Sequence, residues 1–170
     1  MSDREADEAD AFMDALGPVL PMAYRLAYAL VHSRHDVDDI LQEATLNAWR
    51  HRGALRRGSH IRPWFLAIVA NQCRQAVRTR WWSVIRRPEL NSMAGPDDRA
   101  IDDVEDLRQG LRRLGDRDRV VLVLRYYLDL PFDDVAATLH ISSQAARVRT
   151  HRALARLRPI VRSIEDLADE

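Results

Sequence analysis

The stretch from Pro131 to Arg158, PFDDVAATLHISSQAARVRTHRALARLR, predicts two short helices joined by a tight turn, and this pattern decides the fold. Its first helix carries an apolar face made of Val135, Ala136 and Leu139. The residues His140 and Ile141 interrupt that face. Ser142 then stands where its side chain can cap a second helix by accepting a backbone N–H.

The second helix of this stretch combines a narrow apolar stripe with a basic remainder. The stripe follows helical spacing and consists of Ala146, Thr150, Ala153 and Leu157. The other faces carry Arg147, Arg149, His151, Arg152, Arg156 and Arg158. A helix of this kind fits the major groove, where Arg reads guanine edges and grips phosphates. The alternative from this stretch alone is an ordinary helical hairpin with a solvated basic face.

The composition of the whole chain favours a helical globular protein. Of its 170 residues 46% are hydrophobic and 31% charged, and only six are glycine. A chain of this length forms one domain or two small ones. No apolar run approaches the ~18 residues that span a bilayer, and the acidic N-terminus is unlike a secretory signal. We therefore expect a cytoplasmic protein without membrane insertion, and its single cysteine, Cys73, fits a reducing compartment.

The formal net charge of zero conceals a segregation of charge along the chain. Residues 51–88 carry nine Arg and no acidic residue, and residues 119–158 carry seven Arg against three acids. The segments between and outside these blocks are acidic. Two basic blocks predict two separate contacts with a polyanion, and the acidic segments predict protein contacts. The zero net charge argues against tight, indiscriminate DNA binding by the free chain.

The N-terminal half predicts one compact helical unit over residues 12–82. Apolar spacing predicts helices over residues 16–31, 36–49 and 63–77. We expect Asp36 to cap the second helix and Pro63 to occupy the first turn of the third. The stretch GALRRGS at residues 53–59 predicts a loop. The first dozen residues are polar and acidic, and they predict a frayed end.

The C-terminal half predicts a second helical unit over residues 102–160, after a linker at 83–101 that is rich in Pro, Gly, Asn and Asp. Four helices are expected there, the second of them capped by Asp116. Trp81 and Trp82 fall beyond the preceding helix, where they could pack on the linker, touch DNA or face an inhibitor. The predicted fold class is all-α, with two small helical domains joined by a flexible linker.

Several motifs of the chain resemble those of bacterial extracytoplasmic-function (ECF) sigma factors, which are specificity subunits of RNA polymerase. The stretch DVDDILQE at residues 36–43 resembles region 2.2 of that family, and PWFLAIVAN at residues 63–71 with Arg78 resembles regions 2.3 and 2.4. Residues 114–119 and 130–136 resemble region 4, as does the helix 144–158. The matches occur in the expected order, with the linker in the expected place.

The resemblance implies partners and a role for each surface. Region 2.2 would bind RNA polymerase core at the β′ clamp coiled coil, through Asp36, Asp38, Asp39, Leu41, Gln42 and Glu43. A basic partner helix would complement the carboxylates. From charge alone, this segment also fits a solvated, well-capped helix start. Region 4 would contact the β flap, and an anti-sigma factor would regulate the chain.

The resemblance also places two promoter contacts. The −10 element would be bound and melted by Leu55, Arg56, Arg57, Gly58, Ser59, Asn71, Arg74 and Arg78. Their loop resembles the element that traps a flipped base, which would offset the cost of unstacking it. A solvated Arg face is the alternative. The −35 duplex would be contacted by Ser142, Arg147, Val148, Arg149, His151 and Arg152.

The chain departs from the family pattern at four positions. Ala145 stands where Thr is common, Val148 where Ser is common, and Thr150 where an aliphatic residue packs. Because Val148 cannot donate a hydrogen bond but can contact a thymine methyl, the −35 sequence that is read is expected to be unusual. Thr45 replaces an aromatic residue, which changes the local packing expected for region 2.2.

Three other functions are weaker explanations of the sequence. A conventional helix-turn-helix regulator does not need the basic block at 51–88, and a sigma-like adaptor that has lost polymerase binding does not need the acidic helix. A metal protein would have to use His32, His35 and Cys73, a weak set without a second cysteine. No catalytic motif is present, so we expect no enzyme activity, no metal and no cofactor.

Overall fold

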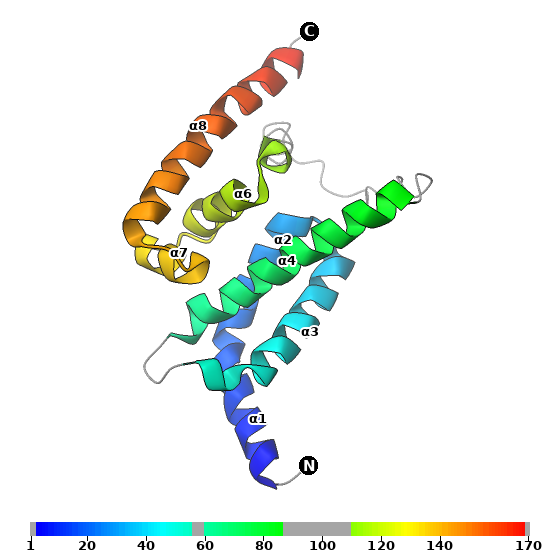
Figure 1. The fold of residues 1–170 in the computed structure, drawn as a ribbon, viewed down its shortest axis with the longest axis vertical. Coiled ribbons are helices and arrows are strands. Elements are labelled where there is room, and N and C mark those ends of the chain that lie inside the picture. The colour runs from blue at the N-terminus through cyan, green and yellow to red at the C-terminus, as the bar shows by residue number, and fades with distance from the viewer. Residues whose placement is uncertain (1–2, 56–59, 87–109, 169–170) are drawn as a thin grey trace. The chain divides into compact units, whose positions relative to one another are not determined.

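The computed structural model describes residues 3–55, 60–86 and 110–168, with side chains described over 6–55, 60–78 and 110–160. The chain divides into two compact units, Met1–Arg87 and Pro88–Glu170. Every regular element in the described ranges is a helix (Figure 1), so the all-α prediction is confirmed. Most of the predicted linker, residues 87–101, lies outside the described residues. No helix that the structure describes is long and apolar enough to cross a membrane.

The first unit is built on three helices that pack against one another. Its elements are α1 (Asp3–Leu16), η1 (Gly17–Val19), α2 (Leu20–Val31), α3 (Arg34–Arg50), η2 (Arg52–Ala54) and α4 (Ile61–Arg86). Figure 1 shows α2, α3 and α4 side by side, and each packs on the other two. Their shared core contains the buried side chains of Leu26, Val37, Phe65, Leu66 and Val69. Burial of each contributes about 1.5–3 kcal/mol to stability.

The N-terminal segment of this unit is more ordered than expected. The predicted frayed end is wrong, because α1 is helical from Asp3 onward. The Phe12 ring meets the Trp49 ring edge-on, with 5.5 Å between the ring centroids. The predicted cap of α3 at Asp36 is also wrong. Ser33 holds that position, and its Oγ accepts the N–H of Asp36 at 3.4 Å.

The long helix α4 exceeds its predicted length at both ends. It continues to Arg86, so Trp81 and Trp82 lie within it and not beyond it as predicted. The physical reason is that the chain holds neither glycine nor proline between Pro63 and Pro88. Nothing local therefore stops the helix before Pro88, whose ring disfavours a helical conformation for the residue before it.

The second unit places one long helix against two shorter ones. Its described elements are a helical turn at 110–113, α6 (Asp116–Leu122), a π-helical turn η4 (Val123–Tyr127), α7 (Phe132–Leu139) and α8 (Ser143–Ala168). Helix α8 packs on both α6 and α7. The predicted cap at Asp116 is wrong, because Gly115 is the cap residue and makes no side-chain bond. Asp118 of α6 is buried and pairs with Arg156 of α8, which ties these helices together.

Candidate functional sites

The turn between α7 and α8 has the geometry of a helix-turn-helix. His140 ends α7 in a left-handed conformation, and the backbone N–H of Ile141 donates to the carbonyl of Ala136 at 3.0 Å. The Oγ of Ser142 accepts the N–H of Ala145 at 3.1 Å, so the predicted cap is confirmed. Across the turn, the Ser143 hydroxyl donates to the carboxylate of Asp133. These bonds fix the start of α8 relative to α7.

Helix α8 separates a buried face from an exposed basic face. The predicted stripe is confirmed, since Ala146, Thr150, Ala153 and Leu157 are all buried. The candidate −35 residues Arg147, Val148, His151 and Arg152 are all exposed. At about 100° per residue these four fall within an arc about 140° wide, on the side away from the stripe. We call this set the reading face. Arg149 is half-buried at its margin, and Ser142 is exposed at the helix start.

The unusual Thr150 is accommodated within the stripe by a local hydrogen bond. Its hydroxyl donates to the carbonyl of Ala146 at 2.8 Å, one helical turn back. A buried hydroxyl without a partner would cost about 1–3 kcal/mol, and this bond removes that cost. Thr150 therefore packs where the family has an aliphatic residue without disturbing the reading face.

Two arginines gather around Phe132 at the start of α7. The guanidinium carbon of Arg147 lies 4.6 Å from the Phe132 ring centroid, and that of Arg125 lies 5.1 Å from it. Arg125 also bonds to Asp129 Oδ1 and to the carbonyl of Leu130, each at 3.3 Å. The sequence does not predict this cluster, because no helical period relates a residue of α7 to one across the turn.

The candidate −10 residues fall in two groups. Asn71, Arg74 and Arg78 are all exposed and follow the i, i+3, i+7 spacing of one face of α4. Arg74 donates to the side-chain oxygen of Asn71 and, at 3.4 Å, to the carbonyl of Ala70. Leu55 is half-buried just after η2. The loop residues Arg56, Arg57, Gly58 and Ser59 lie outside the described residues.

Arg52 links the first basic block to the N-terminal helix, a contact that the sequence analysis missed. Its guanidinium carbon lies 3.8 Å from the Trp49 ring centroid, and its Nη2 lies 3.4 Å from Glu8 Oε2. The edge-on contact of Phe12 with the same tryptophan completes this cluster. Trp49 is thus half-buried beneath α1 and Arg52, which agrees with a packing role for this residue.

The candidate polymerase-binding residues lie on the exposed side of α3. Asp38, Asp39, Gln42 and Glu43 are exposed, whereas Asp36 and Leu41 are half-buried. Asp39 lies 3.8 Å from the ring of His35, and Glu43 lies 3.8 Å from Arg50. Such exposed pairs are worth at most about 1 kcal/mol, so both carboxylates can exchange partners at little cost. We call these six residues the acidic surface.

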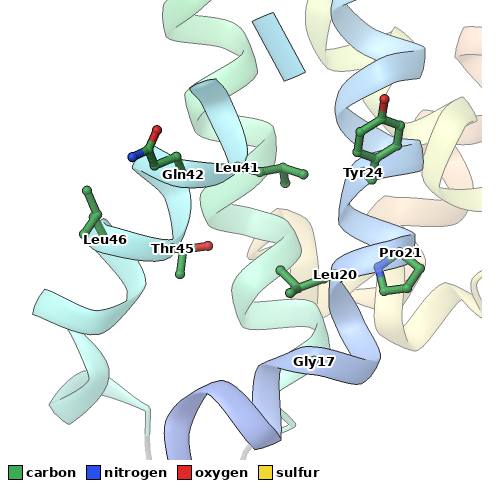
Figure 2. A pocket seen from close by; sticks show the side chains of 8 residues that line it. All are labelled: Gly17, Leu20, Pro21, Tyr24, Leu41, Gln42, Thr45 and Leu46. Atoms are coloured by element: carbon green, nitrogen blue, oxygen red, sulfur yellow. The ribbon is translucent and has the colours of Figure 1, made fainter. Parts of the chain in front are cut away.

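An apolar hollow of about 650 Å³ adjoins the acidic surface between α2 and α3. It is lined by Gly17, Leu20, Pro21, Tyr24, Leu41, Gln42, Thr45 and Leu46. Figure 2 shows Leu41 pointing from α3 toward α2 and Leu20 pointing from α2 toward α3. Thr45, which stands where the family has an aromatic residue, forms part of the lining. Leu46 also lines the hollow and is 43% exposed. It was not among the predicted site residues, although it follows Gln42 by four residues and therefore lies on the same face of α3.

Burial shifts the pKa of two titratable groups among the described residues. Burial raises the pKa of the Cys73 thiol to about 12, and that cysteine is 1% exposed. Burial also lowers the pKa of Arg119, against the opposing effect of Asp116. Within the described ranges, no three His, Cys, Asp or Glu side chains are grouped so that they could hold a metal ion.

Comparison with known proteins connects both units to one family. Residues 17–83 match Sigma-70 region 2, and residues 105–157 match Sigma-70 region 4. The ECF RNA polymerase sigma factor SigD of Mycobacterium bovis is 32% identical, over 96% of this chain and 82% of SigD. The chain belongs to the ECF family of RNA polymerase sigma factors.

Other sigma factors are similar to this ECF sigma factor over nearly its full length. RNA polymerase sigma factor CarQ of Myxococcus xanthus is 28% identical and aligns over 92% of each chain. The fold is similar to that of RpoE from Bartonella quintana, with a TM-score of 0.69, 22% identity and coverage of 89% of this chain and 97% of RpoE. The chain is thus an alternative sigma factor, which directs bacterial RNA polymerase core to promoter DNA.

Proposed function

We propose that this sigma factor reads the −35 duplex with the reading face of α8. The observation that carries this proposal is that the side chains of this face are exposed together on one side of the helix. Arg147, Val148, His151 and Arg152 are exposed together, opposite a stripe that anchors the helix. Two Arg side chains supply bidentate donors for guanine or phosphate, and Val148 supplies an apolar contact for a thymine methyl. Ser142 and Arg149 flank this face and would bind phosphates.

The first unit supplies the other two contacts of this proposal. The acidic surface and the apolar hollow would dock on the β′ clamp coiled coil, whose basic and apolar side chains would complement them. Asn71, Arg74 and Arg78, with the loop from Leu55 to Ser59, would bind and help melt the −10 strand. In this scheme residues 12–82 and 102–160 are the two functional domains, joined by 83–101, and the second also contacts the β flap.

The chain itself supplies no catalytic group in this scheme, because RNA polymerase core forms the phosphodiester bonds in the cytoplasm. The RpoE structure from B. quintana is a complex with the anti-sigma factor NepR. We extend that mode of control to this chain: an anti-sigma factor would bind it and keep its DNA-binding surfaces from promoters until released.

Run-off transcription tests this function directly. Core polymerase of the native host is incubated with the chain on a library of −35 and −10 promoter variants. We expect specific transcripts that are lost in the Asp39→Ala/Gln42→Ala variant and in the Arg147→Ala/Arg152→Ala variant. The controls are Asp10→Ala on α1 and Arg117→Ala on α6, which remove exposed charges outside the proposed surfaces. They should leave transcription unchanged.

The location of each defect distinguishes the proposed contacts. The Asp39→Ala/Gln42→Ala variant should fail to bind core, whereas the Arg147→Ala/Arg152→Ala variant should bind core but not select promoters. If the chain bound duplex DNA but core gained no initiation, a conventional helix-turn-helix regulator would be the better description. If both double variants transcribed normally, the assignment of these surfaces would be wrong.

A further inference from the structure

We propose that Phe132 is a positioning residue for promoter reading: its ring holds the Arg147 guanidinium in the orientation that meets the −35 duplex. This inference rests on the proposed function, because it requires that Arg147 contacts DNA. Phe132 itself is the first residue of α7 and lies outside the reading face. Its contribution would therefore be indirect, through the conformation of the arginine.

The geometry of the contact fits a cation–π interaction. The guanidinium carbon of Arg147 lies 4.6 Å from the ring centroid, well inside the ~6 Å within which the ring quadrupole attracts a cation. Side chains of a helix lean toward its N-terminus. Arg147, near the start of α8, therefore leans toward the turn and α7. Among the described residues, the Phe132 ring is the group that the Arg147 guanidinium contacts.

The backbone around the pair is held firmly enough for the contact to persist. The Ser143 hydroxyl bonds to Asp133, the neighbour of Phe132, and the Ser142 cap fixes the first turn of α8. Arg125 also lies near the ring, with its guanidinium carbon 5.1 Å from the same centroid, and it is anchored by its ion pair with Asp129. The half-buried ring therefore has little freedom to turn away from Arg147.

A guanidinium held over an aromatic ring keeps its N–H donors available for bidentate recognition, because those donors lie in the plane of the guanidinium and the ring accepts no conventional hydrogen bond from them when it covers the guanidinium face. Those in-plane donors are the ones that bind the O6 and N7 atoms of guanine. An unrestrained arginine loses conformational entropy when it binds DNA. The ring lowers this cost, because it already restricts the side chain before binding. Phe132 should thus strengthen binding only where Arg147 is present.

A double-mutant cycle on promoter binding tests the inference. Full-length chain is assembled with core polymerase, and the affinity of this holoenzyme is measured for the promoter duplex selected by run-off transcription. The four chains are wild type, Phe132→Leu, Arg147→Ala and the double variant. Leucine keeps an apolar side chain but has no ring. We expect Phe132→Leu to weaken binding about two- to fivefold in wild type, and to have no effect in the Arg147→Ala background.

The cycle separates failure of the inference from failure of the proposed function. If Arg147→Ala left promoter affinity unchanged, both the −35 assignment and the inference would be overturned. If Arg147→Ala weakened binding but Phe132→Leu caused equal losses in both backgrounds, Phe132 would be a structural residue and only the inference would fall. The same holds if Phe132→Leu changed nothing in either background.

A second measurement detects the contact in the wild-type chain itself. In NMR spectra of the full-length wild-type chain, the side-chain protons of Arg147, assigned with Arg147→Lys, should be shifted upfield by the ring. Phe132→Trp, which offers a larger π face, should keep that shift and keep promoter affinity within about twofold of wild type. An unshifted Arg147 in wild type would overturn the inference, even if Phe132→Leu failed to fold.

Discussion

Cys73 lies inside α4 and shares the core of the first unit with Phe65 and Val69. It is 1% exposed, and burial raises the pKa of its thiol to about 12. The thiolate is the reactive form of cysteine, and an exposed thiol has a pKa near ~8.5. The native thiol is therefore both inaccessible and protonated at neutral pH, and its role is to fill space in the core.

The raised pKa of Cys73 predicts a specific dependence of stability on pH. The folded state keeps the thiol protonated, while the unfolded chain loses that proton as the pH passes ~8.5. The contribution of this group is thus complete below about pH 8.5, and it declines as the pH rises toward 12. Urea unfolding at pH 8 and pH 10 should give a larger loss for wild type than for Cys73→Ala, by about 2 kcal/mol.

The Cys73→Ala variant is the appropriate comparison because all other titrating groups remain in it. It should be less stable than wild type at pH 8, since it removes a buried side chain. An equal loss of stability in both proteins between the two pH values would contradict the protonated, buried thiol.

At the scale of elements, the presence of most helices could be predicted from the sequence, but their end residues could be predicted only in part. The stripe of α8 and the Ser142 cap follow from spacing and from local hydrogen bonding, which act within a few residues. Helix α1 was missed because it is stabilised by tertiary contacts, among them Phe12 on Trp49, that its own polar sequence does not show. At α3, both Ser33 and Asp36 are cap residues by type, and only the three-dimensional structure distinguishes them.

Ser142 combines a structural and a proposed DNA-binding role, and two substitutions separate them. Ser142→Ala removes the cap of α8 and should lower the free energy of unfolding by about 1 kcal/mol. Ser142→Asp keeps a good cap, so its thermal stability should stay near that of wild type. Its carboxylate would repel DNA phosphates, so promoter affinity should fall all the same. Calorimetry and holoenzyme binding to the promoter measure the two effects, and equal promoter affinity of Ser142→Asp and wild type would refute the DNA contact.

The apolar hollow between α2 and α3 predicts a further contribution to polymerase binding. Leu46, at its edge, is 43% exposed, and Met13 of α1 is also 43% exposed but lies outside the hollow. Leu46→Ser should weaken binding to core polymerase by about 1–2 kcal/mol, since burial of the remaining apolar area would be lost. Met13→Ser is the matched control and should bind core as wild type does. Similar affinities for the two variants would exclude the hollow from the interface.

At the scale of the whole molecule, the distribution of charge is the property that could be predicted best from the sequence. The basic blocks at 51–88 and 119–158 contain the exposed arginines of α4 and α8, and the acidic surface on α3 precedes both blocks in the sequence. Contacts made across turns could not be anticipated. The cluster of Arg125, Phe132 and Arg147 depends on the path of the chain after α7, which no local pattern encodes.

Promoter binding by the holoenzyme should therefore depend on salt through both units. Each phosphate contact contributes about −0.9 to the slope of log Kobs against log salt concentration. Arg78→Ala and Arg149→Ala should each reduce the magnitude of that slope by about 1. Arg117→Ala, an exposed arginine of α6, should leave it unchanged. A slope that responded to only one of the first two variants would limit the phosphate contacts to a single unit.

The burial of Cys73 also makes this chain convenient for optical work. Because it is the only cysteine and its thiol is shielded, a cysteine introduced at the exposed Ala155 of α8 would react alone with a maleimide dye. The dye would sit on the same continuous helix as Arg147 and move with it. Energy transfer to an acceptor on the promoter would then follow, in single molecules, the moment at which α8 arrives at and leaves the −35 site.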